Sequence, residues 1–350
     1  MKKMKKNVWF VVNPISGTSD KQRIVDLIPQ YLPASDFRVR VCYTQYSGHA
    51  AEIAHAAVSG HVDVVVAVGG DGTVNEVARS LIHTDTALGI VPCGSGNGLA
   101  RHLSIPLSPE GALQVIGGCV IGEMDYGRIN GTPFFCTCGV GFDAFVSSKF
   151  AESGRRGLLS YIENTLKEGL QYRPETYDIE IDDENGEHIH CNAFLIACAN
   201  ASQYGNNVYI APSASMSDGL MDITIMQPFT VLEAPQIAIQ LFRGTIGHNS
   251  RIQTFRCRHL TIHRKQPGVI HFDGDPKQES ADLEIELVPH DIRMVINPQQ
   301  KAVPALLLQM FTDLYNGVNA EWMQLRQDLR ETPRRIRTIN KELLKKLRPQ

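Results

Sequence analysis

Three glycine-containing turns, each placed directly after a short apolar run, constrain the fold of this chain more than any other feature. The runs and the turns that follow them are 8–12 with 13–17, 62–68 with 69–76, and 87–91 with 92–98. Helical patterns lie between the runs, so the order along the chain is strand, helix, strand. This order is typical of an α/β domain with a parallel sheet covered by helices. Because ligands of such sheets collect at the carboxyl ends of the strands, all three turns are expected at one edge.

The composition of the turns favours a site for phosphate groups. Glycine lets backbone N–H groups approach an anion, and the start of a helix adds about half a positive charge. The pattern is not a Walker loop, and Gly94-x-Gly96-x-Gly98 is one residue short of the dinucleotide fingerprint. Each turn taken singly is explained as well by a structural role. Together they predict that a polyphosphate binds at this edge.

The second half of the chain has a different texture. After about residue 127, short alternating segments are separated by Asn, Gly and Pro, which is typical of antiparallel strands. We therefore expect a nucleotide-binding α/β domain over residues 1–128 and a β-rich, mainly antiparallel domain over residues 129–300. A helical, basic extension is expected over residues 301–350.

The overall composition excludes several classes of protein. The 350 residues contain 43% hydrophobic side chains, and no apolar run reaches the ~20 residues that a membrane-spanning helix needs. Eight cysteines without a Cys-x-x-Cys pair suit reduced thiols in a cytoplasmic protein. A net charge of −3 argues against nucleic acid as a partner.

The turns resemble those of the soluble lipid kinases of the diacylglycerol kinase and sphingosine kinase type. Residues 69–76, Gly-Gly-Asp-Gly-Thr-Val-Asn-Glu, look like the nucleotide-binding signature of that family. Asn-Pro-x-Ser-Gly at 13–17 and Gly-Ser-Gly-Asn at 94–97 support the resemblance, which extends over about residues 7–295. It implies ATP and Mg²⁺ as cofactors. The implied nucleotide-binding residues are Asn13, Pro14, Ser16, Gly17, Thr44, Gly69, Gly70, Asp71, Gly72, Thr73, Asn75, Glu76, Gly94, Ser95, Gly96 and Asn97.

Three aspartates are the candidate catalytic residues. A carboxylate at Asp71 would repel phosphates unless Mg²⁺ bridged them, and by similarity Asp71 shares a magnesium and water network with Asp125. From the residues alone, Asp125 is equally well a turn residue before a strand. The resemblance places a catalytic acid at Asp273, where a carboxylate could accept the proton of an alcohol. Asp273 also fits an ordinary Asp-Gly hairpin, and Asp71 remains a rival for the base. The family's Asp-Gly-Glu motif has Asp275 in its third position here.

A loop over residues 215–222 resembles the family's structural magnesium site. The implied ligands are Ser215, Asp218 and Leu220, of which only Asp218 supplies a carboxylate. An Asx turn between two strands explains the same residues without a metal.

The carboxyl-terminal extension mixes Leu and Ile with Arg and Lys at helical spacing, as in a helix that lies on a membrane surface. We expect peripheral contact with the inner face of a membrane, where a lipid substrate is reached. A solvated helix packed on the body or on a partner is the alternative, and a homodimer is compatible with either.

The function predicted is an ATP-dependent lipid kinase that phosphorylates diacylglycerol to phosphatidic acid. Residues 94–100 look closer to the sphingoid-base branch, so a sphingosine or sphinganine kinase is one alternative. An NAD kinase is another, because that related family shares Gly-Gly-Asp-Gly-Thr. A catalytically silent lipid- or nucleotide-binding regulator is the third, although all three aspartates are present.

Overall fold

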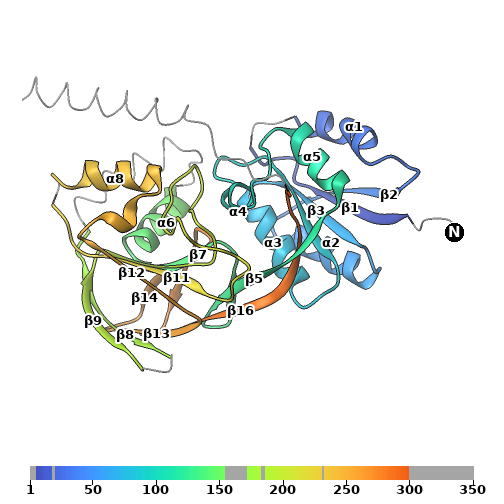
Figure 1. Ribbon diagram of the computed structural model, residues 1–350. Coiled ribbons are helices and arrows are strands. Elements are labelled where there is room, and N and C mark those ends of the chain that lie inside the picture. The colour runs from blue at the N-terminus through green and yellow to red at the C-terminus, as the bar shows by residue number, and fades with distance from the viewer. Residues whose placement is uncertain (1–4, 18–19, 154–171, 183–185, 231, 299–350) are drawn as a thin grey trace, which may run out of the picture. The chain divides into compact units, whose positions relative to one another are not determined.

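The computed structural model describes residues 5–17, 20–153, 172–182, 186–230 and 232–298. By its internal contacts the chain separates into two units, Met1–Lys301 and Ala302–Gln350. The basic extension expected over residues 301–350 lies outside the described residues, so its membrane contact stays a prediction. The labelled elements in Figure 1 all belong to the first unit.

A parallel sheet forms the first lobe, which we define as residues 5–129. Its strands are β1 (Lys6–Val12), β2 (Phe37–Tyr43), β3 (Val64–Gly69) and β4 (Ala87–Pro92). Its helices are α1 (Lys21–Tyr31), α2 (His49–Ser59), α3 (Asp71–Leu81), α4 (Gly98–His102) and α5 (Pro109–Gly118). The strands lie in the order β2-β1-β3-β4, all parallel. Helices α1 and α5 pack together on one face, and α2 and α3 on the other (Figure 1).

The apolar runs of the sequence become the buried centre of this sheet. Every residue of β3 and β4 is buried, as expected for parallel strands covered on both faces. Local caps fix the helices that follow: the carboxylate of Asp20 accepts hydrogen bonds from the N–H groups of Gln22 and Arg23 at the start of α1. The carboxyl ends of β1, β3 and β4 therefore point to one edge.

The second lobe, residues 130–298, is built mainly from antiparallel strands. A six-stranded sheet has the order β12-β11-β10-β7-β14-β15, and its paired strands all run antiparallel. A second layer, in the order β9-β8-β13-β16, continues the sheet of the first lobe. Apolar side chains from both layers form the core between them. The strands are β5 (Ile121–Ile129), which leads out of the first lobe, β6 (Thr132–Phe134), β7 (Thr137–Gly141), β8 (Glu175–Ile181), β9 (His188–Ala193), β10 (Leu195–Ala199), β11 (Met221–Met226), β12 (Ile252–Cys257), β13 (His259–Arg264), β14 (Gly268–Phe272), β15 (Asp275–Glu279) and β16 (Asp282–Val295). The predicted fold class is confirmed for both lobes.

Strand β16 joins the two lobes. Its first half pairs with β13 and β5, and its second half pairs with the start of β5 and, at Met294, with Leu88 of β4. The register shifts between Val288 and Ile292, and His290 within this shift has a φ of 53°. Such a bulge bends a strand. Residues 292–295 thereby return to the first sheet, a long-range pairing that no local pattern in the sequence predicts.

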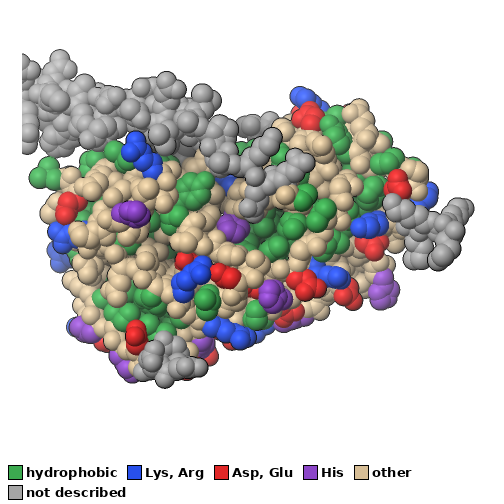
Figure 2. Space-filling view, in the orientation of Figure 1, with side chains coloured by type: hydrophobic (Ala, Val, Ile, Leu, Met, Phe, Trp, Pro, Cys, Tyr) green, Lys and Arg blue, Asp and Glu red, His purple; other side chains and the backbone are tan. Residues whose placement is uncertain are grey.

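The described residues of the second lobe also include α6 (Phe142–Ser153), α8 (Ala234–Arg243) and the short 3₁₀ turn η1 (Ile246–His248). A third apolar cluster packs α6 and α8 against β10. Within the described residues, no helix has both the length and the apolar character needed to cross a bilayer. Acidic, basic and histidine side chains are interspersed on the face shown in Figure 2.

Candidate active site

The three glycine turns meet at one edge of the first lobe. A Cβ atom built on Gly17 would lie 1.7 Å from the carbonyl oxygen of Cys93, and one built on Gly70 would lie 3.2 Å from the Cα of Gly94. Gly17 also has a φ of 58°, which side chains rarely adopt. The turns approach so closely that a side chain at Gly17 has no room. The structure thus brings together the segments that the sequence singled out.

Several side chains predicted to contact ATP shape the turns themselves. The amide of Asn13 donates to Thr73 Oγ1 at 3.0 Å, and its oxygen accepts from the N–H of Ile15 at 3.1 Å. The side chain of Asn97 accepts from the N–H of Gly94 at 2.9 Å and donates to the carbonyl of the same residue at 2.7 Å. These bonds fix the first and third turns and join the first to the second.

Asp71 connects the second turn to the third. Its carboxylate accepts hydrogen bonds from the N–H groups of Asn97 and Gly98, both at 2.8 Å. A carboxylate at the start of a helix is stabilised by the helix dipole, and here that helix is α4. Both oxygens of Asp71 therefore have backbone donors, a role that the sequence did not reveal.

Asp125 lies within β5 and is fully buried. Its carboxylate accepts hydrogen bonds from the N–H groups of Gly219 and His290, both at 2.8 Å. Asp125 is therefore a strand residue rather than a turn residue. In the described part of the chain, no hydrogen bond joins Asp125 to Asp71, so the network implied by the resemblance stays a prediction.

The edge formed by the turns can bind an anion. Helix α3 begins at Asp71, and no side chain caps its first N–H groups. Such groups have no partner within a helix and lie at the positive end of its dipole. Gly72 and Ser95 are exposed at this edge. The arrangement suits the phosphates of a nucleotide.

Other predicted nucleotide-binding residues have different surroundings. Glu76 accepts hydrogen bonds from the N–H groups of Gly48 and Ala50, at 3.0 and 3.2 Å, and so caps the start of α2. Thr44 continues from β2 and donates its N–H to Val12. Pro14 is exposed, whereas Ser16, Thr44, Thr73 and Asn75 are buried.

Two cations that the sequence analysis did not single out lie against the turns. The ammonium of Lys21 donates to the carbonyl of Ser16 at 2.6 Å. The guanidinium of Arg101 donates to the carbonyl of Gly96 at 2.9 Å and to the side chain of Asn207 at 3.2 Å. Neither residue belongs to a glycine motif. Only their positions on the helices that follow the first and third turns, α1 and α4, could have identified them.

Asp273 is held by the segment that separates β6 from β7. Its carboxylate accepts hydrogen bonds from the N–H groups of Phe135, Cys136 and Thr137 at 2.9, 2.7 and 3.2 Å. Phe135 and Cys136 lie between β6 and β7, outside either strand, and their N–H groups bond to the carboxylate instead. Asp273 also has a φ of 52°.

The surroundings of Asp273 tune its acidity. Burial raises its pKa to about 6, although the three N–H groups and the charge of Arg79 oppose this shift. Arg79 comes from α3, pairs with Asp275 at 3.6 Å and lies over the ring of Phe272. Arg79 thus brings the acid of the second lobe next to the helix that starts at the turns.

Negative charge gathers beside this arginine. Burial and the charges of Glu76 and Asp71 raise the pKa of Asp275, while Arg79 lowers it. In the described residues, no group of three His, Cys, Asp or Glu side chains is placed to hold a metal ion. Mg²⁺ bound through ATP needs only one or two carboxylates, because phosphate oxygens and waters complete its shell. The carboxylates of Asp71, Glu76 and Asp275 are compatible with a metal that binds together with the nucleotide.

The loop implied as a structural magnesium site has a different arrangement. One carboxylate oxygen of Asp218 accepts from the N–H of Leu220 at 3.2 Å, and the other lies 3.0 Å from Arg256. The hydroxyl of Ser215 bonds to that of Ser217. Because an arginine already pairs with its carboxylate, the loop as it stands fits an Asx turn better than a cation site.

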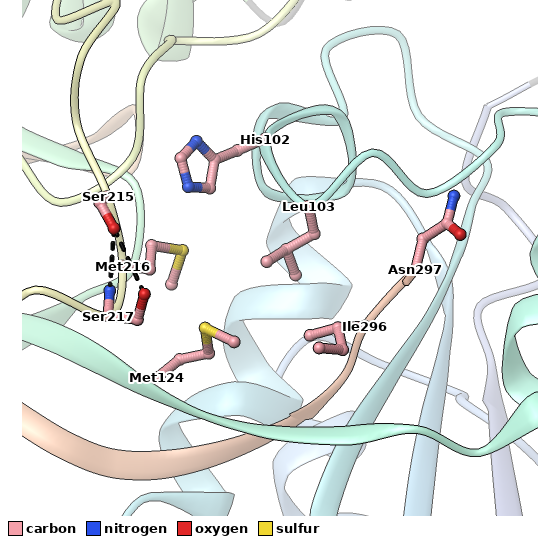
Figure 3. Close-up of a pocket in the computed structure, with 8 residues that line it drawn as sticks. All are labelled: His102, Leu103, Met124, Ser215, Met216, Ser217, Ile296 and Asn297. Carbon is pink, nitrogen blue, oxygen red and sulfur yellow. Dashed lines mark hydrogen bonds between the residues drawn. The ribbon is translucent and has the colours of Figure 1, made fainter. Parts of the chain in front are cut away.

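A small cavity of about 130 Å³ lies beside the same loop (Figure 3). Side chains from α4, β5, the loop and the chain after β16 line it: His102, Leu103, Met124, Ser215, Met216, Ser217, Ile296 and Asn297. None of them belongs to the three turns or holds Asp273. The cavity instead borders Asp125, whose N–H donates to the carbonyl of Met216 at 2.7 Å.

A buried acid and a histidine meet between α6 and β14. The carboxylate of Asp143 accepts from the hydroxyl of Tyr204 at 2.8 Å and lies 3.0 Å from Nε2 of His271, which is 1% exposed. The carbonyl of Tyr204 lies 3.1 Å from where a Cβ of Gly98 would be. No spacing in the sequence predicted this group, because its members come from three distant segments.

Two family models match the chain. One described as the diacylglycerol kinase catalytic domain matches residues 7–129. One described as the YegS C-terminal NAD kinase beta sandwich-like domain matches residues 136–296.

Individual proteins resemble the chain over most of the same region. A diacylglycerol kinase of Mycobacterium tuberculosis is 32% identical over 229 residues, which are 63% of this chain and 72% of that protein. A Synechocystis protein is 30% identical over 255 residues, 69% of this chain and 58% of that protein. A crystal structure of a diacylglycerol kinase from Bacillus anthracis superposes with a TM-score of 0.67 at 22% identity, over 84% of this chain and 97% of that one. That structure supports the likeness of fold.

Proposed function

Because the chain belongs to the diacylglycerol kinase catalytic-domain family of lipid kinases, we propose that it transfers the γ-phosphoryl group of ATP to the hydroxyl of diacylglycerol. The product is phosphatidic acid. The position of Asp273 carries this assignment. Its carboxylate has a pKa of about 6 and lies beside Arg79, and Arg79 belongs to α3, the helix that begins at the second glycine turn.

The proposed reaction divides the work between the lobes. The turns hold the triphosphate by backbone N–H groups, so that the γ-phosphoryl group faces Asp273. Asp273 takes the proton of the lipid hydroxyl as its oxygen bonds to the γ-phosphorus. The bond from that phosphorus to the bridging oxygen breaks, and ADP leaves. Mg²⁺ bound with ATP supplies neutralisation of the phosphate charge.

The choice of diacylglycerol over NAD is supported by the relatives, since the 32% identical Mycobacterium tuberculosis protein is named a diacylglycerol kinase. The aromatic cluster of Phe142, Phe194 and Phe229 does not bear on this choice. It belongs to a core cluster and follows β7 at the end of the strand away from Asp273.

A labelled-phosphate assay tests the proposal. The full chain is incubated with γ-labelled ATP, Mg²⁺ and, separately, diacylglycerol, monoacylglycerol, sphinganine, ceramide and NAD. Label in phosphatidic acid is expected. Label in sphinganine phosphate or NADP would assign the alternative acceptor instead, and no labelled product would indicate a silent regulator.

A matched pair of variants links the activity to the site. Asp273→Asn is expected to lower kcat at least 100-fold, because general-base catalysis contributes 10²–10⁴-fold. Asp178→Asn, on an exposed stretch of β8, is the control and is expected to keep full activity. Equal rates for the two variants would exclude Asp273 as the base.

A further inference from the structure

We propose that Lys21 is a nucleotide-binding residue whose buried ammonium neutralises the triphosphate from behind the glycine turns. Lys21 is the first residue of α1 and is only 7% exposed. Among the described residues it is the one buried lysine. Its ammonium donates to the carbonyl of Ser16, inside the first turn.

The position of this ammonium relates it to all three turns. Its charge opposes the rise in pKa that burial causes at Cys93, so it lies close to the residue before Gly94. The N–H of Cys93 in turn donates to the carbonyl of Gly69 at 2.7 Å, at the start of the second turn. Because Gly17 also contacts Cys93, the cation lies where the three turns converge.

A cation in this place acts by charge rather than by direct contact. Buried charges are screened much less than exposed ones, so an ammonium held against the turns attracts phosphates bound there even without touching them. Its bond to the carbonyl of Ser16, at 2.6 Å, holds the ammonium against the first turn. The attraction grows with the charge of the ligand, and the effect of removing the ammonium is therefore expected to differ between ATP and adenosine.

The assignment rests on the proposed function, since it presupposes that ATP binds at the turns. Calorimetric titration of the full chain with MgATP, MgADP and adenosine tests it without a lipid substrate. Lys21→Gln keeps a donor for Ser16 but removes the charge, and Lys21→Arg keeps both. Arg23→Gln, two residues further along α1 on an exposed side chain, is the matched control.

We expect Lys21→Gln to weaken MgATP binding about tenfold, MgADP binding less, and adenosine binding hardly at all. Lys21→Arg and Arg23→Gln are expected to stay within twofold of the unaltered chain. Equal weakening of all three ligands, or no weakening, would overturn the role of Lys21. If the unaltered chain binds no ATP, the proposed function itself fails. If the unaltered chain binds ATP but Lys21→Gln binds it equally well, only the role of Lys21 fails.

A second measurement covers the case in which Lys21→Gln does not fold. The ¹⁵N signal of the Lys21 ammonium is followed in the unaltered chain by nuclear magnetic resonance. It is expected to move on addition of MgATP and to stay in place on addition of adenosine. A signal that is unmoved by saturating MgATP would overturn the assignment.

Discussion

Burial shifts the pKa values of His102 and Asp273 in opposite senses. Burial lowers the pKa of His102 to about 4, because it disfavours the charged imidazolium. Burial raises the pKa of Asp273 to about 6, because it disfavours the charged carboxylate. Both shifts have measurable consequences near neutral pH, one for stability and one for catalysis.

His102 is expected to make the fold sensitive to acid. A backbone N–H only donates, so the bond from Ser202 N–H to Nδ1 at 3.1 Å requires an unprotonated Nδ1. The unfolded chain binds this proton below its ordinary pKa of 6.5, whereas the folded chain binds it only near 4. The contribution of His102 to the free energy of unfolding is fully present above pH 6.5. It is expected to fall by up to about 3 kcal/mol as the pH drops to 4.

Urea unfolding at a series of pH values measures this loss. His102→Gln is expected to be less stable at pH 7 but to lose less stability on acidification than the unaltered chain. His55→Gln, on the exposed face of α2, is the control and is expected to retain the full acid dependence. An unchanged slope in His102→Gln would show that other groups cause the acid sensitivity.

Asp273 is expected to set the acidic limb of the rate profile. A general base works only as the carboxylate, so kcat is expected to fall as the pH drops through about 6. Initial rates on detergent-dispersed diacylglycerol between pH 5 and 8 test this. A rate that stays constant over that range would contradict the assignment of Asp273 as the base.

At the scale of elements, the first turn is the least tolerant of substitution. Gly17→Ala would place a methyl group against the carbonyl of Cys93. The first and third turns must then separate, and ATP affinity is expected to fall more than tenfold. Calorimetric titration with ATP measures the loss.

Gly131 supplies the matched control. It also has a positive φ, of 74°, but a Cβ built there meets nothing within 4 Å. Gly131→Ala therefore carries the backbone strain alone, about 1–2 kcal/mol in the free energy of unfolding, with unchanged ATP affinity. Equal effects of the two substitutions on ATP binding would show that contact between the turns is unimportant.

The same scale explains what the sequence could predict. The turns and buried strands were predictable because their residue types follow from local requirements, such as the space at Gly17. The partners of Asp71 and Asp125 were not, because their donors lie 26 to 165 residues away in the chain. Lys21 was missed for a related reason. A lysine at the start of a helix is ordinary in a sequence, and only the packing of the three turns brings its ammonium close to the proposed phosphate site.

At the scale of the whole molecule, the lobes are joined by β16 and by polar contacts beside the turns. The N–H of Asn206 donates to the carbonyl of Gly96 at 3.2 Å, and Arg79 pairs with Asp275. A change at the nucleotide-binding edge of the first lobe is therefore expected to change the pKa of Asp273 in the second.

Membrane contact is a property of the whole chain and depends on residues outside the described ones. Because the extension carries clustered Lys and Arg, deletion of residues 324–350 is expected to reduce binding to anionic vesicles. Activity on detergent-dispersed lipid is expected to stay unchanged. Vesicle sedimentation measures the binding, and equal binding with and without the extension would remove this role.

The coupling between the lobes is open to a direct test at Arg79. Its charge lowers the pKa of Asp273 against the effect of burial. In Arg79→Gln this opposition is lost, so the pKa of Asp273 rises further. The pH at which kcat falls on acidification is then expected to move up, toward neutrality. Arg251→Gln, which removes an arginine paired with Glu233 elsewhere in the second lobe, is expected to leave the limb in place. If the limb does not move in Arg79→Gln, a residue of the first lobe does not control the base in the second, and the lobes act independently in this respect.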